Sequence, residues 1–130
     1  MRSTVATALA RSGRRGDAIA ELRELLRRRP DWQAAERELS QLLAADPDPA
    51  RRTEAVALAE ELVRTTRTPD AELLAILAVA YEGAARFSDA LRAWSDALTA
   101  ARSTGRTDLV PGLEAAVAAC RGRSQVRGTR

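Results

Sequence analysis

Small and apolar residues recur along this chain with the spacing of one face of a helix. In three segments a small opening residue is followed by apolar or small residues four and seven positions later. Offsets of four and seven return to the same side of an α-helix, so each segment predicts an amphipathic helix. The segments are AIAELRELLRRRPD from Ala18, AVALAEELVRTTRTPD from Ala55 and ALRAWSDALTAARSTG from Ala90, with seams at Leu22 and Leu25, at Ala59 and Leu62, and at Trp94 and Ala97.

A second helical pattern precedes each of these segments. The three preceding stretches carry an apolar or small stripe at Val5, Ala6 and Leu9, at Leu39, Ser40 and Leu43, and at Leu74, Leu77, Ala78 and Tyr81. Breakers separate the two helices of each pair: Gly13 and Gly16, then DPDPARR from Asp46, then the stretch 86–88. The openers Ala18, Ala55 and Ala90 lie 37 and 35 residues apart. The pattern therefore predicts a helix–turn–helix hairpin that is repeated three times.

The third hairpin resembles a known repeat family. It reads Leu74-x-x-Leu77-Ala78-x-x-Tyr81, then Ala90-x-x-x-Trp94, and is similar to the tetratricopeptide repeat pattern W-x-x-L-G-x-x-Y, then A-x-x-x-F, then P. Leucine replaces the tryptophan of that pattern, alanine the glycine, and tryptophan the phenylalanine.

The first hairpin keeps Ala18, Leu22 and Pro30 of the same pattern, and the second is degenerate, with Ser40 at the small position and a longer turn. The resemblance covers roughly residues 3–102. It implies an all-α fold in which antiparallel helix pairs stack into a right-handed superhelix with a concave face.

The sequence predicts one domain over residues 1–121. Its parts are a partial first repeat at 1–30, a second repeat at 31–69, a third repeat at 70–104 and a capping helix at 107–121. Thr107 or Asp108 is expected to cap this last helix, and Gly122 to end it. Its apolar stripe consists of Leu109, Leu113, Ala116, Val117 and Cys120, and it would cover the open seam of the last repeat. The Arg-rich tail 122–130 is expected to be disordered.

Composition agrees with a helical reading. The chain has 130 residues, with 28 Ala and 16 Leu but only 7 Gly and 5 Pro, and alanine and leucine are strong helix formers. The two Ile and seven Val argue against a β-rich fold.

Arginine supplies all 21 basic side chains, yet the formal net charge is only +3. Residues 1–30 carry +5, residues 31–70 carry −4, and residues 103–130 carry +3. Six arginines gather at 14, 15, 23 and 27–29, which raises the alternative of an Arg-mediated nucleic-acid-binding module. Because these arginines scatter around a helix and follow its C-terminal end, a solvated surface is the favoured interpretation.

The chain lacks the groups that most catalytic and metal sites require. It contains no histidine and a single cysteine, Cys120, which is interpreted as a buried small hydrophobe. The spacing Gly13-x-x-Gly16 lacks the lysine of a phosphate-binding loop. We therefore expect a non-catalytic protein without cofactor or metal. The longest uncharged stretch, Leu73 to Tyr81, is too short to cross a bilayer, and no signal peptide is recognised, so a cytoplasmic protein without membrane insertion is expected.

Three of the four aromatic residues lie within fourteen positions, at Tyr81, Phe87 and Trp94. A stacking platform for a ligand would need exposed rings beside arginines. Core packing between the two helices of a hairpin is the favoured interpretation, with the three rings in one cluster. The predicted core comprises Leu22, Leu25, Leu39, Leu43, Leu77, Ala78, Tyr81, Phe87, Ala90 and Trp94.

The predicted function is that of a protein–protein interaction module or scaffold. The family resemblance implies that a peptide or partner helix binds the concave groove, which is lined by the first helix of each repeat. Mapped onto this sequence, the groove positions are Ser3, Thr7, Arg11, Arg37, Gln41, Ala45, Glu72, Val79 and Glu82. The alternatives are a C-terminal regulatory or scaffolding segment of a larger, even enzymatic, protein, and the nucleic-acid-binding module. Weak self-association through the incomplete first repeat is a further expectation.

Overall fold

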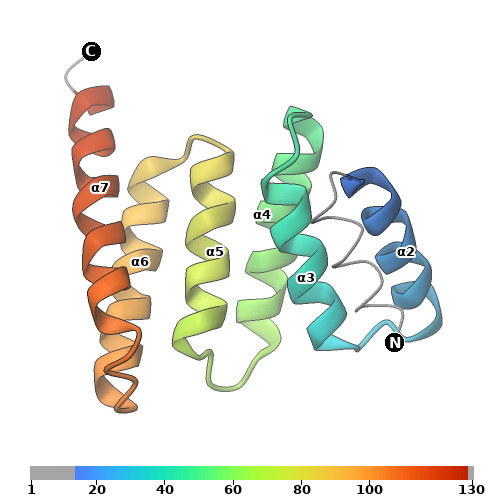
Figure 1. Cartoon of the computed structure of the whole chain (residues 1–130), viewed down its shortest axis with the longest axis horizontal. Coiled ribbons are helices and arrows are strands. Elements are labelled where there is room, and N and C mark those ends of the chain that lie inside the picture. Colours follow the sequence, from blue (N-terminus) through green and yellow to red (C-terminus); the bar gives the residue numbers. More distant parts are fainter. Residues whose placement is uncertain (1–13, 129–130) are drawn as a thin grey trace.

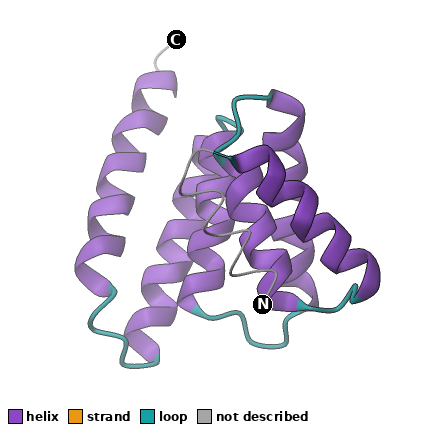
Figure 2. Cartoon of the chain, turned by 45° about the vertical axis from the view of Figure 1, so that its right-hand side comes forward, coloured by secondary structure: helices purple, strands orange, loops and turns teal. Residues whose placement is uncertain are grey.

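A computed structural model of the chain describes residues 14–128, with side chains up to Arg123. These residues form helices joined by loops and contain no strand (Figure 2), so the all-α prediction is confirmed for this part of the chain. The helices are α2 (Arg15–Arg28), α3 (Gln33–Ala44), α4 (Pro49–Thr65), α5 (Ala71–Gly83), α6 (Phe87–Ser103) and α7 (Val110–Gly128).

Successive helices run in opposite directions and each packs against the next along the row (Figure 1). Helix α3 also packs against α5, which places the first helices of the second and third predicted hairpins side by side. The pairs α3–α4 and α5–α6 thus correspond to those two hairpins. The right-handed superhelical stacking remains a prediction.

Two apolar clusters hold the row together. The larger one draws on α2 to α6, and the smaller one joins α5 and α6 to Leu113 at the start of α7. Trp94 packs against both clusters. The aliphatic residues that the sequence placed in the core are buried, namely Leu22, Leu25, Leu39, Leu43, Leu77, Ala78 and Ala90. Ser40, at the small position of the second hairpin, is also buried, and its hydroxyl donates to the Ala55 carbonyl oxygen over 3.2 Å.

The three clustered aromatic rings are half-buried, and their grouping into one cluster stays a prediction. Tyr81 packs against the larger cluster, as Trp94 does. Phe87 is the first residue of α6. It lies beside α7, because the Arg123 guanidinium is 6.0 Å from its ring centre.

The Tyr81 side chain is fully engaged within the chain. Its hydroxyl donates to Glu60 over 2.6 Å, and the Arg86 guanidinium lies 4.7 Å from the ring centre. Desolvation, together with the bond to Glu60, raises the pKa of Tyr81 to about 12. Because Arg86 covers the ring, this geometry favours a packing role over ligand stacking.

The α5–α6 and α6–α7 turns share one hydrogen-bond pattern. In the first turn the Arg86 N–H donates to the Tyr81 carbonyl over 2.8 Å and the Ala85 N–H to the Glu82 carbonyl over 3.0 Å. In the second turn Arg106 donates to Ala101 over 2.8 Å and Gly105 to Arg102 over 3.4 Å. This is the Schellman ending of a helix, which needs one left-handed residue. That residue is Gly105 (φ 75°) in one turn and Ala85 (φ 61°) in the other.

Replacing Ala85 with glycine is therefore expected to raise the free energy of unfolding by about 0.5–1 kcal/mol. The left-handed conformation costs a residue with a Cβ about 1–2 kcal/mol, and the greater freedom of unfolded glycine offsets part of this gain. The matched variant is Gly105→Ala at the equivalent position, which is expected to lower the stability by a similar amount. Urea unfolding of both variants checks the prediction, and destabilisation by Ala85→Gly would contradict it.

Helix α7 differs from the predicted capping helix at both ends. It begins at Val110 and continues through Gly122 to Gly128, so the expected end at Gly122 is wrong, and residues 122–128 of the supposedly disordered tail are helical. Gly122 is not in the left-handed conformation that ends helices, and a right-handed helical glycine costs only about 1 kcal/mol relative to alanine. At the start, Thr107 and Asp108 lie in a turn, and the Asp108 carboxylate accepts two bonds of 3.1 Å from Arg106.

The inner face of α7 carries Leu113, Val117 and Cys120, all buried. The Cys120 sulfur lies 3.4 Å from the Phe87 carbonyl oxygen, and burial is the main cause that raises the pKa of its thiol. The environment of Cys120 is therefore that of a packing residue. None of the helices within residues 14–128 combines the length and apolar character needed to cross a membrane.

Candidate functional site

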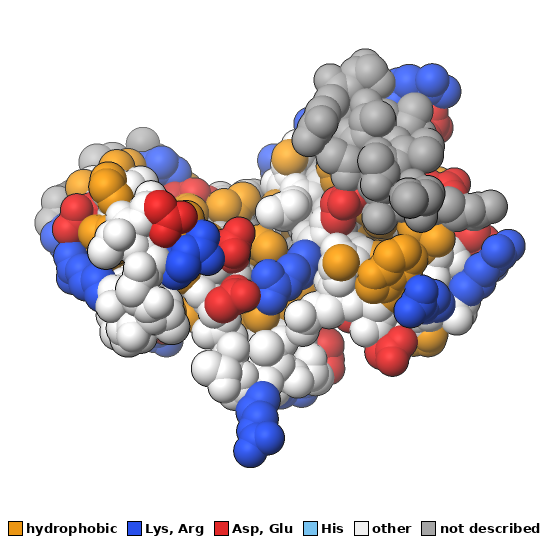
Figure 3. Space-filling model, turned by 60° about the horizontal axis from the view of Figure 1, so that its bottom comes forward, with side chains coloured by type: hydrophobic (Ala, Val, Ile, Leu, Met, Phe, Trp, Pro, Cys, Tyr) orange, Lys and Arg blue, Asp and Glu red, His pale blue; other side chains and the backbone are white. Residues whose placement is uncertain are grey.

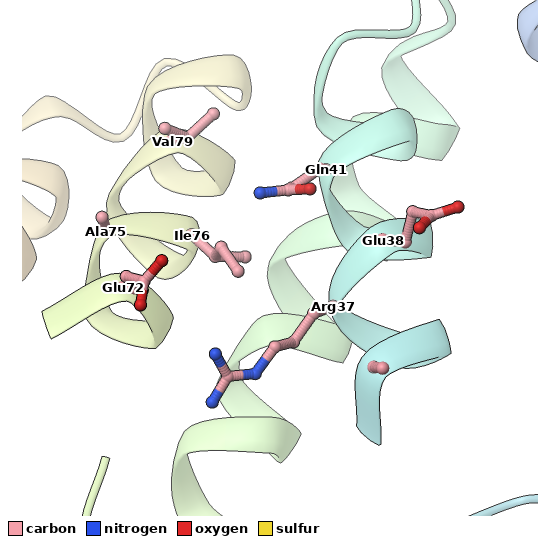
Figure 4. Close-up of a pocket in the computed structure, with 8 residues that line it drawn as sticks. Arg37, Glu38, Gln41, Glu72, Ala75, Ile76 and Val79 are labelled. Carbon is pink, nitrogen blue, oxygen red and sulfur yellow. The ribbon is translucent and has the colours of Figure 1, made fainter. Parts of the chain in front are cut away.

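A groove of about 630 Å³ lies between α3 and α5, the two helices that begin the second and third hairpins (Figure 4). Four residues of each helix line it: Ala34, Arg37, Glu38 and Gln41 from α3, and Glu72, Ala75, Ile76 and Val79 from α5. Both sets follow the offsets zero, three, four and seven, which place them on one face of each helix. Equivalent faces of neighbouring helices therefore form the two walls.

The α5 wall of the groove is largely apolar. Ile76 is buried, Ala75 is half-buried and Val79 is 41% exposed. Among the described residues, Val79 is the large hydrophobic side chain that stands out as exposed. A solvent-open groove with an apolar wall and a few polar side chains has the composition of a ligand-binding site.

Charged side chains mark one end of the groove. Figure 4 shows Arg37 and Glu72 near the start of the two helices, whereas Gln41 and Val79 lie further along them. The Arg37 guanidinium is 3.5 Å from the Asp70 carboxylate, and Asp70 also caps α5 by accepting the Leu73 N–H over 2.7 Å. These contacts connect α3 to the beginning of α5.

Glu72 has a partner from beyond the α5–α6 hairpin. The Arg106 guanidinium in the α6–α7 turn lies 3.5 Å from the Glu72 carboxylate and also binds Asp108. The pKa of Arg106 is raised, mainly by its hydrogen bond to Asp108, and Glu72 adds to this effect. Acidic and basic side chains are mixed on the face of the molecule that Figure 3 shows. Exposed pairs of this kind contribute about 0–1 kcal/mol each, so a ligand can replace one at little cost.

Glu38 is the groove-lining carboxylate for which the described residues provide no ion-pair partner. One of its oxygens is shielded from solvent and accepts no hydrogen bond, although the side chain as a whole is partly exposed. Its carboxylate points away from α5 in Figure 4, toward the outer side of α3. The Glu38 carboxylate therefore does not face the groove.

The structure brings together four of the residues that the sequence placed on a concave face: Arg37, Gln41, Glu72 and Val79. Glu82 is elsewhere, because the Arg123 guanidinium of α7 pairs with it at 3.1 Å. Ala45 is exposed just beyond the end of α3 and does not line the groove. Ser3, Thr7 and Arg11 lie outside the described residues.

Sequence reasoning missed Ala34, Glu38, Ala75 and Ile76, which also line the groove. Each lies three or four positions from a predicted groove residue, so helical spacing alone could have identified them. Ile76 was missed because it lies off the apolar stripe that the sequence predicted for this helix, although the structure buries it.

The arginine-rich segment around α2 is largely engaged within the chain. Arg14 pairs with Asp17 at 3.2 Å and Arg23 with Glu54 at 2.8 Å. Arg27 and Arg28 both pair with Glu24, and the Arg29 guanidinium lies 4.9 Å from the Trp32 ring centre. These pairs are exposed, and they offset only part of the positive charge that binding to a phosphate backbone would need.

The described part of the chain contains no cluster of three or more histidine, cysteine or acidic residues arranged to hold a metal ion. Comparison with protein-family models, with curated proteins and with solved structures gives no match for this chain.

Proposed function

We propose that this chain is a non-catalytic protein-interaction module, built like a tetratricopeptide repeat array, which binds a peptide segment or partner helix in the α3–α5 groove. The observation that carries the proposal is the exposed Val79 beside a buried Ile76 in a solvent-open groove with polar rims. A partner's apolar side chain would pack on this wall, and Gln41 would offer both a donor and an acceptor to the partner's backbone.

The rigidity of the two walls supports this proposal. Arg37 connects α3 to the Asp70 cap, and both helices are packed into the larger apolar cluster. A groove that is formed before binding limits the conformational entropy lost on association. The internal pairing of the arginines around α2 makes the nucleic-acid alternative the weaker one.

A random twelve-residue peptide library selected on the full chain tests this function. The selected peptides are expected to bind the Gln41→Ala/Val79→Ser variant roughly tenfold more weakly, because an apolar contact and an amide partner are lost. The control is Ala57→Ser, on an exposed position of α4 outside the groove lining. Peptides that bind wild type and the groove variant equally would contradict the proposal, provided both proteins have the same helical circular dichroism.

A further inference from the structure

Helix α7 is supported by fewer neighbours than the helices in the middle of the row. Among the described helices it packs against α6 alone, whereas α3, α4, α5 and α6 each pack against at least two others. Figure 1 shows α7 at the end of the row, with its C-terminal end extending past α6. In a row of stacked helices each element is stabilised by its neighbours, so α7 is held from one side only.

The surface between α6 and α7 is built largely from small side chains. Helix α7 contributes Leu113, Val117 and Cys120, and of these three Leu113 alone belongs to one of the two apolar clusters. A small side chain removes little apolar area from water, so burial stabilises the second half of α7 only weakly. The buried residues of α6 are alanines, namely Ala90, Ala93, Ala97 and Ala101.

A polar junction connects the second half of α7 to the rest of the row. The Arg123 guanidinium pairs with the Glu82 carboxylate of α5 at 3.1 Å and lies 6.0 Å from the ring centre of Phe87. The Cys120 sulfur, on the same part of α7, is 3.4 Å from the Phe87 carbonyl oxygen. The Glu82 side chain is only 20% exposed, so its attraction to Arg123 is partly shielded from water and exceeds that of a fully exposed pair.

The turn before α7, residues 104–109, can serve as a hinge. The hydrogen bonds from Gly105 and Arg106 that end α6 run back to carbonyl groups of α6, so α6 keeps them when α7 moves. The Arg102–Glu114 pair, at 2.7 Å, spans the turn with both side chains more than half exposed. Exposed pairs contribute little, so this one does not prevent the movement.

We propose that α7 is a hinged cover at the end of the row: it opens as a unit about the turn 104–109 while α2 to α6 stay folded, and the contact of Arg123 with Glu82 and Phe87 holds it closed. Opening exposes the alanine face of α6 together with the inner face of α7. The inference concerns the end of the row and does not depend on what the α3–α5 groove binds.

Cys120 reports this opening, because it is the single cysteine of the chain and is fully buried. The reaction of the full chain with the thiol reagent DTNB is followed at urea concentrations below the unfolding transition, with the unfolded chain as reference. We expect Cys120 to react at least about tenfold faster than global unfolding permits, and with a weaker dependence on urea, because opening exposes less surface. A reaction that follows global unfolding in both rate and urea dependence would overturn the inference.

Matched variants of α7 test the role of Arg123. Arg123→Gln removes the pair with Glu82 and is expected to raise the rate of the Cys120 reaction roughly threefold to fivefold. Arg121→Gln makes the same change in net charge at an exposed position of the same helix, outside this junction, and is expected to change the rate by less than about twofold. Equal acceleration by both variants would overturn the role of Arg123, because loss of positive charge near the helix end would then explain it.

Hydrogen exchange measured by mass spectrometry separates opening of the helix from a movement of the Cys120 side chain alone. Opening as a unit predicts that the amides of α7 exchange together, and faster than those of α3 and α5. A fast thiol reaction with α7 amides as well protected as those of α5 would overturn the inference. None of these measurements involves a peptide, so their failure leaves the proposed function standing.

Discussion

Replacing Trp94 with alanine is expected to lower the free energy of unfolding by about 3 kcal/mol, near the lower end of the range for removing a tryptophan from a core because the ring is half-buried. The loss would be felt in both parts of the molecule, since Trp94 packs against both apolar clusters. Chemical unfolding followed by circular dichroism measures this change. A loss below about 1 kcal/mol would mean that the two clusters are joined without the ring.

The conservative variant Trp94→Phe isolates one feature of the indole. The Trp94 Nε1–H is shielded from solvent and finds no acceptor among the described residues. Leaving such a donor unsatisfied costs about 1–3 kcal/mol, and phenylalanine removes it while keeping most of the apolar contact. We therefore expect this variant to differ from the wild type by less than about 1 kcal/mol. A loss as large as that of Trp94→Ala would show that the size of the indole outweighs its unsatisfied donor.

Gly83→Ala is expected to destabilise the protein by about 1–3 kcal/mol, although alanine is the better helix former. Gly83 ends α5, and a Cβ at this position would lie 2.7 Å from the carbonyl oxygen of Ala44 at the end of α3. The obstacle is backbone, so relief requires the two helices to move apart. Because these helices form the walls of the groove, the variant is also expected to weaken peptide binding.

The matched control is Gly112→Ala in α7, where no neighbouring atom of the described residues lies within 4 Å of the added methyl group. There the helix propensity of alanine acts alone, and a gain of up to about 1 kcal/mol is expected. Thermal unfolding of the two variants, with peptide anisotropy on each, checks both effects. A stabilising Gly83→Ala would show that α3 and α5 separate without loss.

Much of the fold follows from local periodicity. The seams through Leu39, Leu77 and Ala90 predict where α3, α5 and α6 lie and which face each buries, because burial of one helix face depends on spacing alone. The start of α5 can also be predicted from the sequence, since Asp70 follows a proline and is a residue type that caps helices. Neither inference requires knowledge of distant residues.

The contacts of the groove are less predictable because they join distant segments. Arg37 could pair with any of several acidic residues, and only the folded chain selects Asp70. The family resemblance placed Glu82 on the groove, but in the structure it pairs with Arg123 of α7. The length of α7 was also missed, because a glycine ends a helix only where the backbone turns left-handed, and the residue type does not reveal that at Gly122.

The shared Schellman pattern of the α5–α6 and α6–α7 turns bears on how this sequence can diverge. The bonds that close each turn run between backbone groups, so they survive almost any exchange of side chains around them. One residue per turn is different, since its left-handed backbone admits glycine or asparagine and resists β-branched side chains. These two turns should therefore tolerate most substitutions except at Ala85 and Gly105. In a saturation mutagenesis library, these two positions should lose the most variants.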